Sequence, residues 1–254
     1  MSALKRANKS SNTTPPTNEA MGFLDHLEEL RKRLWRIILI LITGTVISLI
    51  FADQLIAFLI KPFIPNTNEN LALLYPTEGF IVRIKTSFVA GIFLTTPLWF
   101  SQIWGFISPA LFAKEKRIIA PIIALSSLMF LIGAVFGWYV LPFAIKYFQS
   151  LTLKDIAIFW SLGKYIDFTL RLLLAFGIVF ELPLIVFLVA RLGIVTTEQL
   201  RKYRRHTIVA FLILASIITP PDVVTQIILT LPLILLYEVG ILAAKIANKK
   251  RVAL

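Results

Sequence analysis

The segment FTLRLLLAFGIVFELPLIVFLVARL, residues 168–192, contains three charged side chains, Arg171, Glu181 and Arg191. A helix that crosses the hydrocarbon core of a bilayer needs about 20 predominantly apolar residues. This segment is longer than that and is bounded by charge. It therefore predicts a transmembrane helix.

The composition of the whole chain also indicates a membrane protein. Of its 254 residues, 57% are hydrophobic and 16% are charged, with a net charge of +12. So few charges, gathered between apolar runs, cannot supply the charged surface that a soluble domain needs. A nucleic-acid-binding protein would carry its basic residues as a stripe on a polar domain, so that class is excluded. The absence of Cys and the presence of only two His exclude disulfides, thiolate chemistry and a His-rich metal centre.

Five further apolar windows are bounded by charged or turn residues. With the first segment they predict an all-α, polytopic membrane protein with six transmembrane helices. The fifth window is short and would need a thin local bilayer or a tilted neighbour. The six windows are Leu34–Ala52, Ile84–Trp104, Ile118–Leu141, Phe168–Leu192, Thr207–Thr219 and Val223–Ala247.

Lys and Arg residues are divided unequally between the two sides that these helices define. Nineteen fall on the side of the termini and seven on the other side. Because cytoplasmic loops accumulate positive charge, both termini are predicted to be cytoplasmic. Residues 1–20 are polar, lack the apolar core of a signal peptide and are predicted to be a disordered tail. Residues 21–247 would form one membrane domain, and residues 248–254 a basic cytoplasmic tail.

Prolines interrupt three of the predicted spans: Pro97 the second, Pro183 the fourth and Pro232 the sixth. Each lacks an amide donor and clashes with the preceding turn, so bent helices are expected. Membrane helices also tolerate proline without any functional reason. Three kinked spans favour a cupped, concave bundle. The outer connections 53–83 and 146–167 could each hold a short interfacial helix.

One acidic residue, Glu181, lies within the fourth apolar window. An ionisable group in the hydrocarbon costs at least about 2.5 kcal/mol on insertion scales, so Glu181 should face protein or trapped water. A structural interpretation has its carboxyl group bonded to the carbonyl of Val179, which Pro183 leaves unpaired. A functional interpretation makes it part of a polar site, to which Gln226 in the sixth span could belong.

Residues 21–33 are amphipathic and lead into the first span. Apolar residues recur every three to four positions from Phe23 to Leu34, and charged residues fill the other face. This spacing predicts a helix along the cytoplasmic surface. The acid–base pair Glu29–Arg33 has i,i+4 spacing and could do no more than support that helix.

Glu115 is the single acid among three cations in the first inner loop. Considered locally, it could merely neutralise its neighbours. Glu29 and Glu115 would, however, both lie at the cytoplasmic level of a strongly positive face. Because a carboxylate can accept two hydrogen bonds from one guanidinium, the two acids could receive a basic peptide.

Five motifs, taken in order, resemble the successive signatures of the TatC family, the large subunit of the twin-arginine protein translocase. The resemblance covers about residues 21–247. The sequence departs from the family at Gly79, where Ala is common, and at Lys114, which adds a cation before Glu115. The motifs are HLEELRKRL at 26–34, PTEGF at 76–80, WGFISPAL at 104–111 followed by Glu115, FGIVFELP at 176–183, and TPPD at 219–222.

The resemblance implies a cupped six-helix receptor that binds the twin-Arg signal peptides of folded precursor proteins. It implies TatA- and TatB-type single-span partners, an oligomeric complex with further copies of the chain, contact with membrane lipid, and export driven by the proton gradient. The host membrane would be a bacterial inner membrane or a thylakoid. The implied site residues are Glu29, Glu115, Phe106, Arg31 and Leu111 for the signal peptide, Glu181 and Gln226 for intramembrane polar or partner contact, and Pro62 and Asp222 in the outer loops.

No nucleotide-binding Gly-rich loop, metal-ligand cluster or hydrolase triad is found in the sequence. We therefore expect no catalytic residue, cofactor or metal, and do not predict an enzyme. The alternative function is an ion-coupled secondary transporter that uses Glu181 as its proton site. Such a transporter should tolerate the loss of Glu29 and Glu115, whereas a signal receptor should lose peptide binding.

Overall fold

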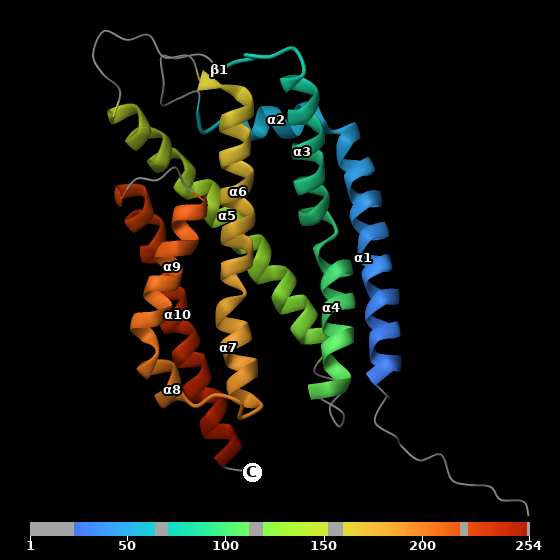
Figure 1. Cartoon of the computed structure of the whole chain (residues 1–254), viewed down its shortest axis with the longest axis vertical. Helices are drawn as coiled ribbons and strands as arrows, with labels where there is room; N and C mark the ends of the chain where they lie inside the picture. The colour runs from blue at the N-terminus through green and yellow to red at the C-terminus, as the bar shows by residue number, and fades with distance from the viewer. Residues whose placement is uncertain (1–22, 64–70, 112–118, 152–159, 219–222, 253–254) are drawn as a thin grey trace, which may run out of the picture.

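The computed structural model describes residues 23–63, 71–111, 119–151, 160–218 and 223–252, and these are mostly helical (Figure 1). The predicted all-α class is confirmed, with two two-residue strands added to it. The helices are α1 (Phe23–Ile50), α2 (Ala52–Ile60), α3 (Glu78–Leu94), α4 (Thr96–Leu111), α5 (Ile119–Ser150), α6 (Leu162–Phe180), α7 (Leu182–Arg191), α8 (Thr197–Lys202), α9 (Arg204–Ile218) and α10 (Val223–Val252), and the strands are β1 (Leu71–Ala72) and β2 (Trp160–Ser161).

Among the described residues, four helical segments are long and apolar enough to cross a membrane: α1, α5, α6 continued by α7, and α10. The pair α3–α4 makes a fifth candidate and is bent by 61°. Helix α9 has 15 residues and is about 22 Å long, short of the roughly 30 Å of a hydrocarbon core. The chain is therefore a helical membrane protein, while the count of six spans and their orientation stay predictions.

Two of the three predicted proline positions lie just after helix breaks. Pro97 falls in the first turn of α4 and Pro183 in the first turn of α7, where the missing amide donor is not needed. The hydroxyl of Thr95, between α3 and α4, donates to a carbonyl oxygen in the last turn of α3 at 2.7 Å. Glu181 occupies the equivalent place between α6 and α7. Pro232, by contrast, lies inside α10, which continues through it.

Helix α1 differs from the expected arrangement of two segments. The amphipathic residues 21–33 were expected to lie along the membrane surface, ahead of a separate span. The described part of this segment instead continues into the span as one helix of 28 residues. Packing explains the difference, because α4 contacts this part of α1 at His26 and Arg33, while α3 packs against the span beyond it at Gly44. At the other terminus, α10 runs to Val252, into the segment predicted as a basic tail.

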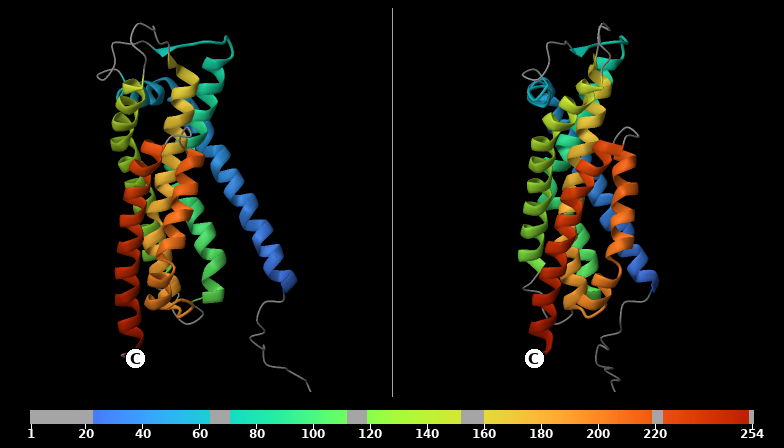
Figure 2. Two further views of the ribbon diagram at one scale, coloured as in Figure 1. Left: turned by 60° about the vertical axis from the view of Figure 1, so that its left-hand side comes forward. Right: turned by 90° about the vertical axis from the view of Figure 1, so that its left-hand side faces the viewer.

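The helix ends and the short elements lie at two opposite ends of the molecule. The start of α1, the end of α4, α8 and the end of α10 lie at one end, called the terminal end below (Figure 1). Helix α2 and both strands lie at the opposite end, called the cap end. Segments that the sequence assigns to the cytoplasmic side thus gather at the terminal end. Figure 2 shows from two further sides that α1 inclines away from α10 toward that end.

The two outer connections are joined at the cap end. Helix α2 lies in the first connection, where a short helix was expected, while the described part of the second carries β2, which pairs in parallel with β1. The carboxylate of Glu78 completes the junction. Its Oε1 accepts hydrogen bonds from the Ser161 hydroxyl and the Gly163 N–H, both at 2.6 Å, and its Oε2 accepts one from the Leu74 N–H at 2.6 Å.

Two helix pairs approach closely at glycine. A Cβ atom on Gly133 of α5 would lie 2.4 Å from the carbonyl oxygen of Phe176 in α6. A Cβ atom on Gly91 of α3 would lie 2.6 Å from the backbone nitrogen of Thr45 in α1. Neither distance leaves room for a side chain, so these glycines allow the backbones to pack directly, as small residues do between membrane helices.

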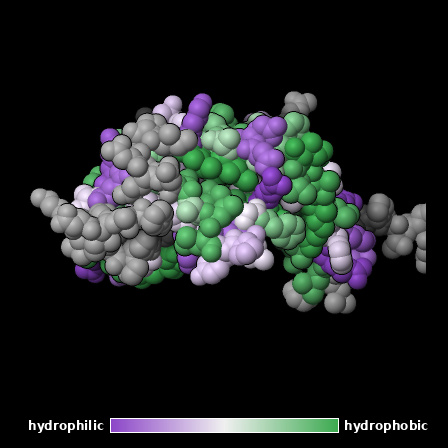
Figure 3. Space-filling view, turned by 90° about the horizontal axis from the view of Figure 1, so that it is seen from above, coloured by the Kyte–Doolittle hydropathy of each residue, from purple (hydrophilic) through white to green (hydrophobic). Residues whose placement is uncertain are grey.

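The sides of the bundle expose apolar side chains. Trp35, Ile178 and Leu231 are each more than 60% exposed, on α1, α6 and α10. Figure 3 views the molecule from the cap end and shows hydrophobic residues over much of the surface outside the grey atoms. Apolar surface of this extent is expected where a protein is in contact with hydrocarbon.

Candidate functional site

The strongest candidate site lies at the terminal end, where the first turns of α1 pack against the last turns of α4. We call it the α1–α4 site, and it comprises His26, Glu29 and Arg33 of α1 with Gly105 and Phe106 of α4. The amphipathic spacing places His26, Glu29 and Arg33 on one face of α1, because residues three and four apart are neighbours on a helix. The rings of His26 and Phe106 are stacked with their centroids 4.3 Å apart.

Arg33 holds the carboxylate of Glu29, which confirms the i,i+4 contact. Its Nε and Nη2 both donate to Oε1 of Glu29, at 2.9 and 2.6 Å. The two side chains are only 20% and 22% exposed. Oε2 of Glu29 is buried and has no hydrogen-bond partner among the described residues. The adjacent pair Glu28–Lys32 is also in contact, at 2.9 Å, but both of its side chains are more than half exposed.

Arg33 also reaches from α1 to the backbone of α4. Its Nη1 lies 3.4 Å from the carbonyl oxygen of Gln102, to which it donates. A Cβ atom on Gly105 would lie 2.2 Å from the same nitrogen, so only glycine leaves this position open to the guanidinium. The Glu29 carboxylate is therefore fixed by a side chain that both helices hold.

The structure brings together part of the predicted signal-peptide set. Glu29 and Phe106 both belong to the α1–α4 site, whereas Arg31 is exposed on α1. Leu111 is the last residue of α4, with its side chain outside the described atoms, and Glu115 lies outside the described residues. The approach of Glu115 to Glu29 stays a prediction.

A second polar cluster surrounds Glu181 at the break between α6 and α7. Glu181 is 6% exposed, and its carboxyl group is hydrogen-bonded to the hydroxyl of Ser126 on α5. The sequence had suggested the carbonyl of Val179 as the partner. The indole Nε1 of Trp104 donates to Ser126 Oγ at 2.9 Å. Since Trp104 directly precedes Gly105, helix α4 contributes to both clusters.

The remaining predicted residues lie apart from this cluster. Gln226 of α10 donates from Nε2 to the carbonyl oxygen of Leu212 in α9, at 2.7 Å, and so joins these two helices. Its partnership with Glu181 stays a prediction. Pro62 lies just beyond α2 at the cap end, and Asp222 falls outside the described residues.

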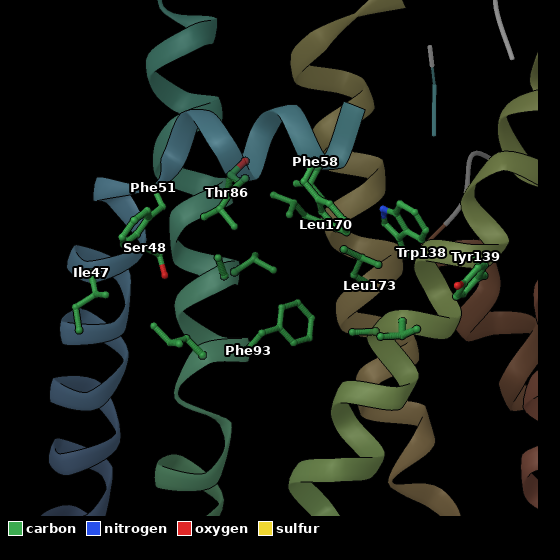
Figure 4. Close-up of a pocket in the computed structure, with 17 residues that line it drawn as sticks. Ile47, Ser48, Phe51, Phe58, Thr86, Phe93, Trp138, Tyr139, Leu170 and Leu173 are labelled. Carbon is green, nitrogen blue, oxygen red and sulfur yellow. The ribbon is translucent and has the colours of Figure 1, made fainter. Parts of the chain in front are cut away.

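A groove of about 800 Å³ lies between α1, α2, α3, α5 and α6 (Figure 4). Its walls are mainly apolar and include Phe51, just before α2, and Phe58 within α2. Two polar atoms on its lining residues, Thr86 Oγ1 and Trp138 Nε1, are buried without a hydrogen-bond partner among the described residues. Glu181 is not one of the lining residues. It lies instead at the α6–α7 break, covered by α5.

A family model described as Sec-independent protein translocase protein (TatC) matches residues 25–232. The chain belongs to the TatC family. A TatC of Desulforapulum autotrophicum is 39% identical over 236 residues, covering 92% of this chain and 87% of the relative. A TatC of Helicobacter pylori (strain ATCC 700392 / 26695) is 41% identical, covering 88% of this chain and 87% of the relative. The crystal structure titled Twin Arginine Translocase Receptor TatC matches with a TM-score of 0.81 and 36% identity, covering 88% of this chain and 99% of that chain.

Membership of the TatC family decides between the functions considered from the sequence. This TatC-family chain is a membrane component of a Sec-independent protein translocase, and TatC is not an enzyme family. The ion-coupled transporter with Glu181 as its proton site is not favoured.

Several residues that build these clusters had no role predicted from the sequence. Trp104 and Gly105 directly precede Phe106 in the motif at 104–111, so their position in the sequence could have indicated that they belong to the same site. Glu78 likewise stands in the PTEGF motif. Ser126 lies in an otherwise apolar window, and nothing in the local sequence indicates that Glu181 is its partner.

Proposed function

We propose that the α1–α4 site binds the twin-arginine segment of signal peptides on folded precursor proteins. The observation that carries the proposal is Glu29, a shielded carboxylate whose Oε2 is buried without a partner among the described residues. The stacked rings of His26 and Phe106 lie on the same part of the molecule. A guanidinium donates several N–H bonds in one plane and stacks on aromatic faces, so it suits both features. The related solved structure is titled as a twin arginine translocase receptor, which supports this ligand.

The second arginine of the segment would be bound by Glu115, with Arg31 and Leu111 shaping the same patch. The terminal end would then face the cytoplasm, as the excess of Lys and Arg in its segments predicts. On such a positive face, Glu29 and Glu115 supply the attraction for a basic segment. Because the Glu29 carboxylate is shielded, its attraction should exceed that of an exposed acid and should still weaken with salt.

The groove between α1, α2, α3, α5 and α6 would receive the apolar stretch of the signal peptide. Its apolar walls support this assignment. TatA- and TatB-type subunits and further copies of the chain would complete the translocase, which the proton gradient would drive. Glu181 and Gln226 would make the intramembrane polar contacts with a partner or signal helix, and Pro62 and Asp222 would mark outer loops needed for transport.

Peptide binding to two charge-neutralised variants tests the proposal. The measurement is the Kd of a twin-Arg signal peptide, with a twin-Lys peptide for comparison, for the purified protein in nanodiscs. Glu29→Gln should weaken twin-Arg binding about tenfold or more, since charge-assisted hydrogen bonds contribute about 1.5–3 kcal/mol.

Glu28→Gln is the matched control. It removes the same charge from the neighbouring residue, whose ion pair with Lys32 is exposed. It should change the Kd little. Equal losses in both variants, or equal binding of the twin-Arg and twin-Lys peptides to the unmodified protein, would contradict the proposed site.

A further inference from the structure

The Glu29 carboxylate is already bound by an arginine of its own chain. Arg33 Nε and Nη2 donate to Oε1 at 2.9 and 2.6 Å, and the pair is largely shielded from solvent. A ligand guanidinium that binds both carboxylate oxygens would need Oε1, which Arg33 occupies, as well as the unpaired Oε2. The site therefore contains an internal group of the same chemical class as its proposed ligand.

Arg33 is also held in this position from the opposite helix. Its Nη1 donates to the carbonyl oxygen of Gln102, and the absence of a side chain at Gly105 leaves the space that its guanidinium occupies. The neighbouring cation Lys32 lacks this setting, since it and Glu28 are both more than half exposed. Of the two i,i+4 pairs, only the one at the candidate site is built into the α1–α4 contact.

We propose that Arg33 is an internal competitor for Glu29 and sets the affinity that a cationic segment must exceed to bind. The inference rests on the proposed function of the α1–α4 site. Between ligands, Arg33 compensates the charge of a shielded carboxylate, which would otherwise be costly to leave unpaired. An incoming guanidinium takes its place on Glu29, so weakly basic segments do not occupy the site.

If Arg33 competes with the ligand, its loss changes peptide affinity in the opposite direction from the change expected if Arg33 only positions Glu29. Removing a competitor frees the whole carboxylate and should tighten the binding of cationic peptides. Removing a positioning residue would leave the carboxylate poorly oriented and should weaken binding. Because the competitor is displaced by any ligand, twin-Arg and twin-Lys peptides should gain by the same factor.

The experiment compares Arg33→Gln with Lys32→Gln in the full-length protein in nanodiscs, with the Kd of the twin-Arg peptide as the readout. Both variants remove one positive charge from neighbouring positions of α1, so they change the long-range field alike. Arg33→Gln should tighten binding about fivefold more than Lys32→Gln does, the scale of a partly shielded ion pair. In the Glu29→Gln background the Arg33→Gln effect should disappear.

A second variant protects the test against loss of the α1–α4 contact. If Arg33→Gln lowers the melting temperature, Gly105→Ala takes its place, because the added Cβ would lie 2.2 Å from Nη1 and displace Arg33 without changing any charge. It too should tighten binding. Unchanged or weaker twin-Arg binding would overturn the proposal, relative to Lys32→Gln for a folded Arg33→Gln variant and relative to the unmodified protein for Gly105→Ala. If the unmodified protein does not bind the twin-Arg peptide at all, the proposed function itself fails, which is a different outcome.

Discussion

At the scale of single residues, some polar side chains in this protein find hydrogen-bond partners on other helices. The hydroxyl of Tyr165 donates to the carbonyl oxygen of Leu59 at 2.7 Å, and Gln226 bonds the backbone of α9. In hydrocarbon a polar group without a partner costs several kcal/mol, so each such bond fixes one helix against another. The sequence identified Glu181 and Gln226 as polar groups that need a reason. Their partners lie on neighbouring helices, Ser126 on α5 and Leu212 on α9, and no local pattern in the sequence pairs these residues.

The first residue-scale prediction concerns Ser126, the link between Trp104 and Glu181. Ser126→Ala removes the hydroxyl that accepts from the Trp104 indole and bonds the Glu181 carboxyl. Leaving buried polar groups unpaired costs about 1–3 kcal/mol, so this variant should lower thermal stability by that order. Thermal unfolding in detergent measures the change.

Ser150→Ala serves as the control, because its exposed hydroxyl bonds only a carbonyl of its own helix in the described structure. It should be nearly neutral. Equal melting temperatures for the Ser126 and Ser150 variants would show that the Trp104–Ser126–Glu181 cluster does not stabilise the fold.

At the scale of elements, the apolar windows predicted that helices exist more accurately than they predicted the residues at which those helices begin and end. Window length and hydropathy report the burial of a helix in hydrocarbon, but its ends depend on packing and capping. The second window therefore corresponds to two helices, α3 and α4, that break at Thr95 just before Pro97. The first window began at Leu34, whereas α1 begins at Phe23 because α4 packs against the amphipathic turns. Strands β1 and β2 have two residues each and form only because distant connections meet, so no sequence period could predict them.

The element-scale prediction tests the direct contact between α5 and α6. Gly133→Ala would place a Cβ atom 2.4 Å from the backbone oxygen of Phe176, which cannot swing aside as a side chain can. Forcing the helices apart should cost about 1–3 kcal/mol, as overpacking does in other cores. Urea or thermal unfolding of the protein in micelles would detect this loss.

Gly79→Ala provides the comparison, since its Cβ would meet only a leucine methyl group at 3.9 Å. It should leave stability within about 0.5 kcal/mol of the original, as most surface changes do. A Gly133 variant as stable as the Gly79 variant would mean that α5 and α6 do not pack through this glycine.

At the scale of the whole molecule, the proposed binding site and the junction of the two connections lie at opposite ends of the protein. The terminal end holds the α1–α4 site, while the cap end ties two connections together through Glu78 and the paired strands. The apolar groove lies between the two ends, beneath α2. The charge distribution predicted this division of the chain into two sides. It could not predict that Arg33 occupies Glu29, because i,i+4 spacing is shared by the exposed pair Glu28–Lys32.

The central claim, that the α1–α4 site receives a twin-arginine segment, is tested most directly by crosslinking. A photoreactive phenylalanine replaces Phe106 in one variant and the exposed Leu231 of α10 in another, and each is mixed with a twin-Arg precursor in membranes. The account predicts crosslinks from position 106 that are lost when the two arginines of the precursor are changed to lysine. Any crosslinking from position 231 should be the same with both precursors. Crosslinking at position 106 that is absent, or that persists equally with the lysine precursor, would contradict it.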